Sequence, residues 1–261
     1  MKSTITTIAL LAITAGTASA DFSSFVIRDG ANGSPDILAN NAYGTPAIEF
    51  VIGEGSQKAG LGSNGINGSS IGDINGLQIT RHDDSTRFAG GSGPAVAPYF
   101  NIWVTDGIGN YAVIANEPSN GAFQALKIDN GNGSFSYDLD FSDLSDKVAK
   151  VYETAGAGDG TSWVHSLIGN SGPLTFADLS GLMIAPPPSS YIAGGNGVGT
   201  GAPRELGTND AYGFTWVFGD TLSNYVSGAE GYVVSGFQVP TPGALTLLGL
   251  GGLVANRRRR A

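Results

Sequence analysis

The stretch that decides the fold class is "YFNIWVTDGIGNYAVIANE", residues 99–117. Phe100, Ile102 and Val104 fall on one face of a predicted strand, and the intervening residues fall on the other. The connection "DGIG" (106–109) then separates this run from a second apolar run. Because Asp and Gly are favoured in tight connections between strands, the stretch predicts a β-hairpin.

Similar strand-like runs recur along the chain. They cover residues 23–29, 47–53, 76–81, 123–129, 134–141, 147–154, 212–220 and 230–239. The sequence "DNGNG" (129–133) predicts a second hairpin turn. The only helical pattern is the short run 175–183, with Thr175 as its N-cap.

These patterns predict an all-β fold. We expect residues 21–238 to form one antiparallel β-sandwich, jelly-roll-like, with one short helix. The Gly-rich stretch 53–76 is expected to be a long loop with room for a short strand around Leu61. Two small β domains that meet near 155–162 are the alternative architecture.

The composition limits the chemistry and the partners of this body. The chain has no Cys, which excludes disulfides, thiolate metal sites and a cysteine nucleophile. All 22 Asp and Glu residues but only eight of the 13 Lys and Arg residues lie between Asp21 and Gln238, so the formal charge there is eight minus 22, or −14. Such an acidic body repels phosphate backbones, so we expect no nucleic-acid partner.

The N-terminus has the layout of a secretory signal peptide, residues 1–20. Lys2 precedes a mostly apolar run, and Ala18-Ser19-Ala20 has the small-residue pattern of a cleavage site. The mature chain is therefore expected to begin at Asp21, and the protein is expected to be exported.

The C-terminus combines a proline motif, an apolar run and a basic cluster. The motif is Val239-Pro240-Thr241-Pro242, and the cluster is Arg257, Arg258, Arg259 and Arg260. A helix over residues 239–256 would be ~27 Å long, close to the ~30 Å hydrocarbon thickness of a bilayer. Residues 243–256 therefore predict a single membrane-spanning helix, whose arginines stay in the cytoplasm.

Residues 239–261 resemble the PEP-CTERM protein-sorting signal, in the variant with Val-Pro-Thr-Pro in place of Pro-Glu-Pro. The resemblance covers this tail only, and the body is not assigned to a family. It implies that an exosortase cleaves the chain near the proline motif while the tail holds it in the inner membrane. The mature protein would then reside at the cell surface or in extracellular polysaccharide.

We therefore expect a non-enzymatic, exported surface or matrix protein. The alternatives are a carbohydrate-binding module for extracellular polysaccharide and a secreted glycan-active enzyme. For binding, Trp103, Trp163 and Trp216 are candidate sugar contacts, although core packing also explains aromatic residues in strands. For catalysis, Glu49 and Glu117 would be the carboxylate candidates, but no catalytic motif is present.

Metal and cofactor sites are not predicted. His82 lies beside Asp83 and Asp84, and a solvated turn is favoured there over a metal site. The stretch 129–133 does not fit the EF-hand pattern, so turn formation is favoured over calcium binding, although a structural Ca²⁺ remains an alternative. His165, close to Trp163, is expected to be a buried or half-buried strand residue.

Overall fold

A computed structural model of the chain describes residues 21–41, 43–87, 97–116, 120–152, 163–195, 201–219 and 230–239. Residues Ser19–Pro242 form one compact unit. Among the described residues no helix is long and apolar enough to cross a membrane. The predicted membrane helix, the signal peptide and the arginine cluster lie outside these residues.

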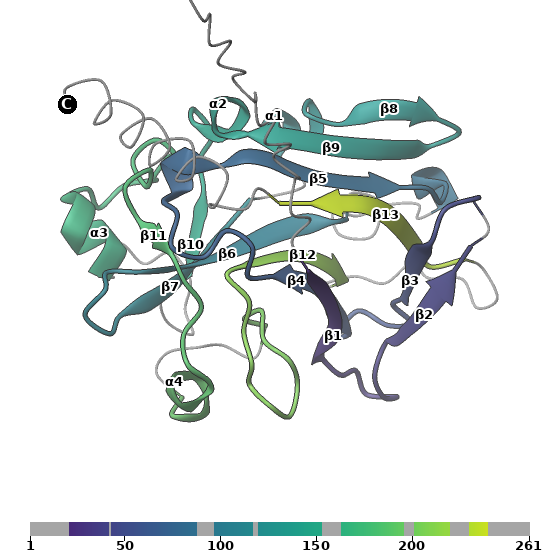
Figure 1. Cartoon of the computed structure of the whole chain (residues 1–261), viewed down its shortest axis with the longest axis horizontal. Coiled ribbons are helices and arrows are strands. Elements are labelled where there is room, and N and C mark those ends of the chain that lie inside the picture. The colour runs from purple at the N-terminus through teal and green to yellow at the C-terminus, as the bar shows by residue number, and fades with distance from the viewer. Residues whose placement is uncertain are drawn as a thin grey trace, which may run out of the picture. The chain divides into compact units, whose positions relative to one another are not determined.

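The body consists of two antiparallel sheets stacked face to face, as Figure 1 shows. In spatial order the first sheet contains β1 (Phe22–Arg28), β4 (Lys58–Ser63), β12 (Phe214–Gly219), β6 (Tyr99–Thr105), β7 (Tyr111–Ala115) and β10 (Lys150–Tyr152), with β11 (Met183–Ile184) also paired to β6. The second contains β2 (Asp36–Asn40), β3 (Ala47–Val51), β13 (Tyr232–Gln238), β5 (Asn75–Arg81), β9 (Ser134–Asp140) and β8 (Ile128–Gly131). The predicted all-β, antiparallel fold is confirmed at this level.

The central hairpin forms as the sequence predicts. Strands β6 and β7 pair with Thr105 opposite Tyr111, and the Asp106 carboxylate accepts backbone hydrogen bonds from Ile108 and Asn110 at 3.0 and 3.1 Å. Gly107 has a φ of 79°, a left-handed conformation that Gly adopts without steric cost. The turn residues and the alternation of apolar residues in the two strands therefore act together to form this hairpin.

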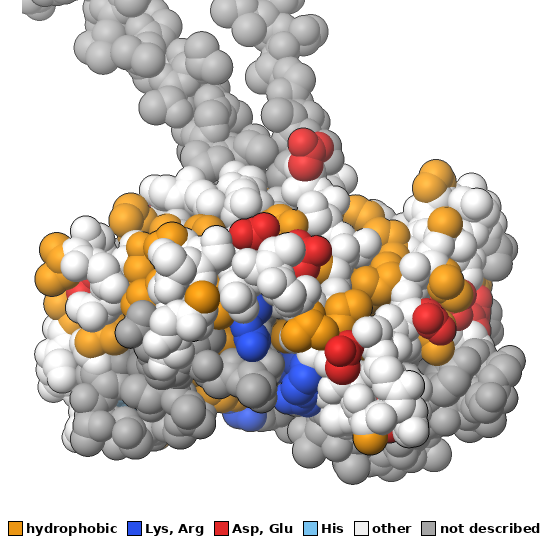
Figure 2. Space-filling view, turned by 90° about the horizontal axis from the view of Figure 1, so that it is seen from below, with side chains coloured by type: hydrophobic (Ala, Val, Ile, Leu, Met, Phe, Trp, Pro, Cys, Tyr) orange, Lys and Arg blue, Asp and Glu red, His pale blue; other side chains and the backbone are white. Residues whose placement is uncertain are grey.

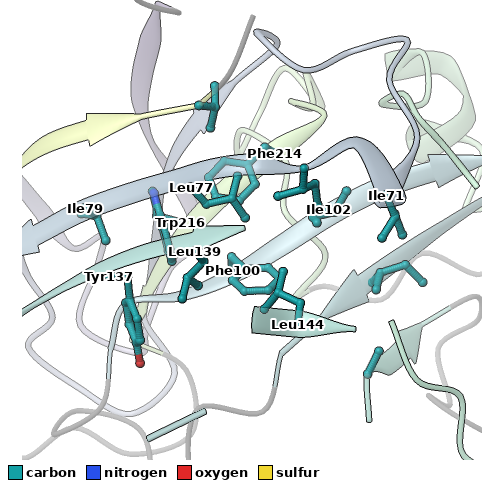
Figure 3. Packing of buried hydrophobic residues seen from close by; sticks show 14 of the residues in the cluster. Ile71, Leu77, Ile79, Phe100, Ile102, Tyr137, Leu139, Leu144, Phe214 and Trp216 are labelled. Carbon is teal, nitrogen blue, oxygen red and sulfur yellow. The ribbon is translucent and has the colours of Figure 1, made fainter. Parts of the chain in front are cut away.

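The core fills the space between the sheets. Figure 3 shows Trp216 and Phe214 from β12 packed with Phe100 and Ile102 from β6, opposite Leu77 from β5. All five side chains are fully buried. Because β12 lies between β4 and β6, and β13 between β3 and β5, the last two strands complete the centre of each sheet. A division into two domains near 155–162 would remove both from their neighbours.

The first sheet is also covered on its outer face, away from the second sheet. Trp103 and Val113 pack there against Ile192 of helix α4 (Ser189–Ala193). In a second group on this face, Phe25 and Ile27 of β1 pack with Tyr99 and Val217. The half-buried Tyr212 packs against this group. Burial on both faces explains why β6 and β12 are buried along their whole length.

The structure corrects two local predictions. Residues 123–129 are not one strand, because Asn120 accepts the Ala122 N–H at 2.9 Å and begins helix α1 (Gly121–Gln124). Residues 176–181 form turns instead of a helix, and Met183 begins β11. The predicted Thr175–Asp178 cap is present, but the carbonyls of Ser180 and Leu182 accept hydrogen bonds from a 3-10 turn, Ile71–Asp73.

The remaining elements are short. Helix α2 (Phe141–Leu144) follows β9, α3 (Trp163–Ile168) precedes the turns at 175–182, and a 3-10 turn spans Ser85–Arg87. His165 lies in α3 and is buried, so the expected strand position is wrong while the expected burial is right. Strand β4 occupies part of the Gly-rich stretch around Leu61, and β2 was not predicted.

Candidate functional site

His82 is the centre of a polar and aromatic group on the outer face of the second sheet. It directly follows β5, and its Nε2 lies 2.7 Å from the Ser235 hydroxyl on the neighbouring strand β13. Its ring stacks on that of Tyr43, with 5.1 Å between centroids and 20° between planes. Tyr43 is 42% exposed, so part of its ring faces solvent.

Two carboxylates lie next to this group, that of Glu230 just before β13 and that of Glu49 on β3. The Tyr43 hydroxyl donates to Glu230 Oε2 at 2.6 Å. Glu49 of β3 accepts the Gly231 N–H at 2.6 Å and the Asn40 side-chain amide at 3.0 Å. We call Asn40, Tyr43, Glu49, His82, Glu230 and Ser235 the His82 surface. An exposed aromatic ring beside carboxylate and amide groups offers apolar contact and hydrogen bonds to a polar ligand.

The sequence neighbours of His82 do not join this surface. The Asp83 side chain is fully buried and pairs with Arg81, with 2.7 Å between Oδ2 and Nη2. Asp84 Oδ1 instead accepts the Thr86 N–H and hydroxyl at 2.9 and 2.6 Å. The three side chains diverge, and no group of three His, Asp or Glu residues in the described ranges could hold a metal ion.

The Ser235–His82 contact has the residue types of a nucleophile and a base. Ser235 is 8% exposed, so a substrate has little access to its hydroxyl. Glu49 is held by Asn40 and by backbone, as described above. Glu117, the other proposed carboxylate, lies outside the described residues.

The tryptophans are placed differently from the sugar-contact prediction. Trp103 is 2% exposed, and its Nε1 donates to the Pro203 carbonyl at 2.9 Å under α4. Trp216 is fully buried between the sheets (Figure 3). Neither ring can stack on a sugar in this structure, so both residues are corrected to core positions. Trp163 is half-buried and donates to the Tyr111 carbonyl at 3.2 Å.

The stretch 129–133 contains the end of β8 and the two-residue turn that leads to β9. The Gly131 N–H donates to Asp129 Oδ1 at 2.8 Å, and Asn132 and Gly133 both have left-handed φ values, 54° and 77°. Backbone conformation therefore accounts for the Asn and Gly residues of this stretch.

A pocket of about 410 Å³ lies at the edge of the first sheet. Its walls are β10, His165 of α3 and the segment 171–174. Val148 and Tyr152 at its border are 47% and 37% exposed. This pocket is more apolar in composition than the His82 surface, and none of its described lining residues is Asp or Glu.

Basic side chains converge at another place, around the turn that begins at Gly201. Lys58 Nζ donates to the Gly201 carbonyl at 3.0 Å, and Arg204 Nη1 donates to the Ala202 carbonyl at 3.1 Å. Arg28 approaches the same glycine from the neighbouring strand. Figure 2 shows Lys and Arg side chains gathered in one part of the face it presents, while Asp and Glu side chains are scattered.

Comparisons with protein-family models, with curated proteins and with solved structures found no match to this chain. The site is therefore described from its own geometry. Tyr43 and Ser235 had no signal in the sequence, because their contact with His82 depends on strand pairing across the second sheet. The alternation of β5 and β13 indicates which side chains face outward, but not which residues are neighbours.

Proposed function

We propose that this protein is an exported cell-surface or extracellular-matrix protein, made as a precursor that the tail holds in the inner membrane until an exosortase removes it. The signal peptide ending at Ala20 and the three-part tail of residues 239–261 support this proposal. We further propose that the body is jelly-roll-like. The chain passes from the second sheet to the first and back as it runs from β3 to β4 to β5, which supports this assignment.

The observation that carries the proposal is that the compact body begins and ends close to the boundaries of the two proposed signals. The compact unit spans Ser19–Pro242, and its first strand begins at Phe22, one residue after the expected mature start. Val239 is only 5% exposed and belongs to the core. Removal of both signals would therefore leave every described strand in place.

Burial of Val239 also bears on the processing step. A processing enzyme binds its substrate as an extended segment, which a side chain held in the core does not offer. We infer that the cleaved bond lies after Val239, at or beyond Pro240. Two prolines favour an extended backbone around Thr241, which suits such binding.

Fractionation of cells tests the sorting proposal. Replacement of Arg257–Arg260 by Ser should leave unprocessed precursor in the membrane fraction, and so should replacement of Pro240 and Pro242 by Ala. A matched control replaces Arg204 by Ser within the body and should be released normally. Unchanged release of both tail variants would overturn the proposal.

The His82 surface favours a second function, binding of a polysaccharide. Its exposed Tyr43 ring and the adjoining Glu230 carboxylate are the specific observation. Binding of the full chain in detergent to a panel of polysaccharides should weaken at least about tenfold in Tyr43→Ala, but not in Tyr152→Ala, the control at the far edge of the first sheet. Equal binding by both variants would contradict this role.

A further inference from the structure

Lys127 has an environment that differs from that of an ordinary surface lysine. It lies between α1 and β8, and its side chain is half-buried. Its Nζ lies 4.3 Å from the centre of the Phe135 ring, which is itself 4% exposed. Within the described part of the chain, Nζ has neither a hydrogen-bond acceptor nor a carboxylate partner. The ammonium group therefore loses water and receives only the face of an aromatic ring.

A second cation contacts the same aromatic ring as Lys127. The Arg81 guanidinium lies 5.7 Å from the centre of the same Phe135 ring. Its neighbour Asp83 cannot serve Lys127, because Asp83 accepts from Arg81 and from the Val233 N–H at 2.8 Å. Tyr137 beside Arg81 stays a neutral phenol, since burial raises its pKa. Burial, together with repulsion by Arg81, lowers the pKa of Lys127 to about 8.

We propose that Lys127 is a covalent attachment site for aldehydes, with the open-chain form of a reducing sugar as the physiological class. A lysine beside an apolar group and a second cation has a neutral amine available as nucleophile near neutral pH. The choice of a reducing sugar rests on the proposed extracellular location. The nucleophilic character of the amine is inferred only from the groups that surround Lys127.

The reaction needs no oxidant or reductant. The Nζ lone pair forms a bond to the aldehyde carbon while the C=O π electrons move to oxygen. A proton then passes from nitrogen to oxygen to give a carbinolamine. Loss of water forms the C=N bond of an imine, so one water is released for each sugar attached. At pH 7.5 an amine of pKa 8 is about 200 times more often neutral than one of pKa 10.5.

The test treats the full chain in detergent with cellobiose and cyanoborohydride at pH 7.5, where cyanoborohydride traps the imine as a stable amine. Peptide mass spectrometry then measures the modification rate at each lysine. We expect Lys127 to react at least about tenfold faster than the exposed Lys150, and this preference to disappear in guanidinium. Cellobiitol, which lacks the aldehyde, should modify neither residue.

Two results would overturn the proposal: equal rates at Lys127 and Lys150 in the folded chain, or a preference that survives unfolding. Lys127→Arg keeps the positive charge and should lose the fast site without changing the other lysines. Cell fractionation measures sorting independently of this labelling. Failure of one proposal is therefore distinguishable from failure of the other.

Discussion

Phe22 and Phe237 pack edge to face, with 5.0 Å between their ring centroids. They belong to β1 and β13, the first and last strands of the body, and to different sheets. Their contact brings the beginning and the end of the folded chain to the same place.

Replacement of Phe237 by Ala should destabilise the body by about 1–2 kcal/mol, because a half-buried aromatic pair is lost next to the core. Thermal unfolding should shift down by roughly 2–8 °C for a body of this size. Phe237→Leu keeps apolar volume and should cost less. Unchanged stability in Phe237→Ala would contradict a stabilising contact between the two rings.

The buried Arg81–Asp83 pair gives a second prediction. Both side chains are fully buried, and Arg81 also donates to the Ala97 carbonyl at 2.8 Å. Asp83→Asn should destabilise the fold by about 3–5 kcal/mol, because it leaves a buried guanidinium uncompensated. Arg81→Met combined with Asp83→Asn should cost less than the sum of the single changes in denaturant unfolding. Additive costs would show that the two groups do not interact.

Tyr137 offers a substitution that should stabilise. Its hydroxyl is buried, and it has no hydrogen-bond partner among the described residues. Figure 3 shows the ring in the core, with its oxygen pointing away from the Trp216 nitrogen. Tyr137→Phe removes this unsatisfied group and should raise stability by about 0.5–1 kcal/mol. A loss of stability would mean that the hydroxyl has a partner.

Lys127 predicts a dependence of stability on pH. Its pKa is lowered to about 8 in the folded state, whereas an unfolded chain has the ordinary value near 10.5. Between these values the unfolded state binds more protons, so this residue makes stability rise with pH through that window. Lys127→Met should therefore stabilise the fold at pH 7, and the difference from the natural chain should shrink by pH 10.5. A constant difference across this range would contradict the lowered pKa.

The strands that could be predicted are those whose pattern is local. The alternation in 99–104 and the turn residues at 106–109 identify β6, β7 and their hairpin without knowledge of the rest of the chain. Strand β2 was missed because the three apolar residues of its sequence "DILAN" are consecutive and do not alternate with polar ones, and turn-forming residues flank the strand. Helix α1 was missed because the cap at Asn120 depends on one hydrogen bond within a run that also fits a strand.

The candidate site could be predicted only in part. The sequence singled out His82, but its contacts with Ser235 and Tyr43 depend on the pairing of β5 with β13 and on tertiary packing between distant parts of the chain. Trp103 was misplaced because alternation predicts two faces and does not say that α4 covers the outer one. Strand order and tertiary cover are long-range properties, and one sequence contains no direct signal for them.

We propose that the chain is exported and cut at both ends. The most direct test of this proposal is the intact mass of the natural protein recovered from the medium or the cell surface. We predict a species that begins at Asp21 and ends after Val239 but before the apolar run at Gly243. A recovered protein that still contains Arg257–Arg260, or retention of the whole chain in the cytoplasm, would contradict the account.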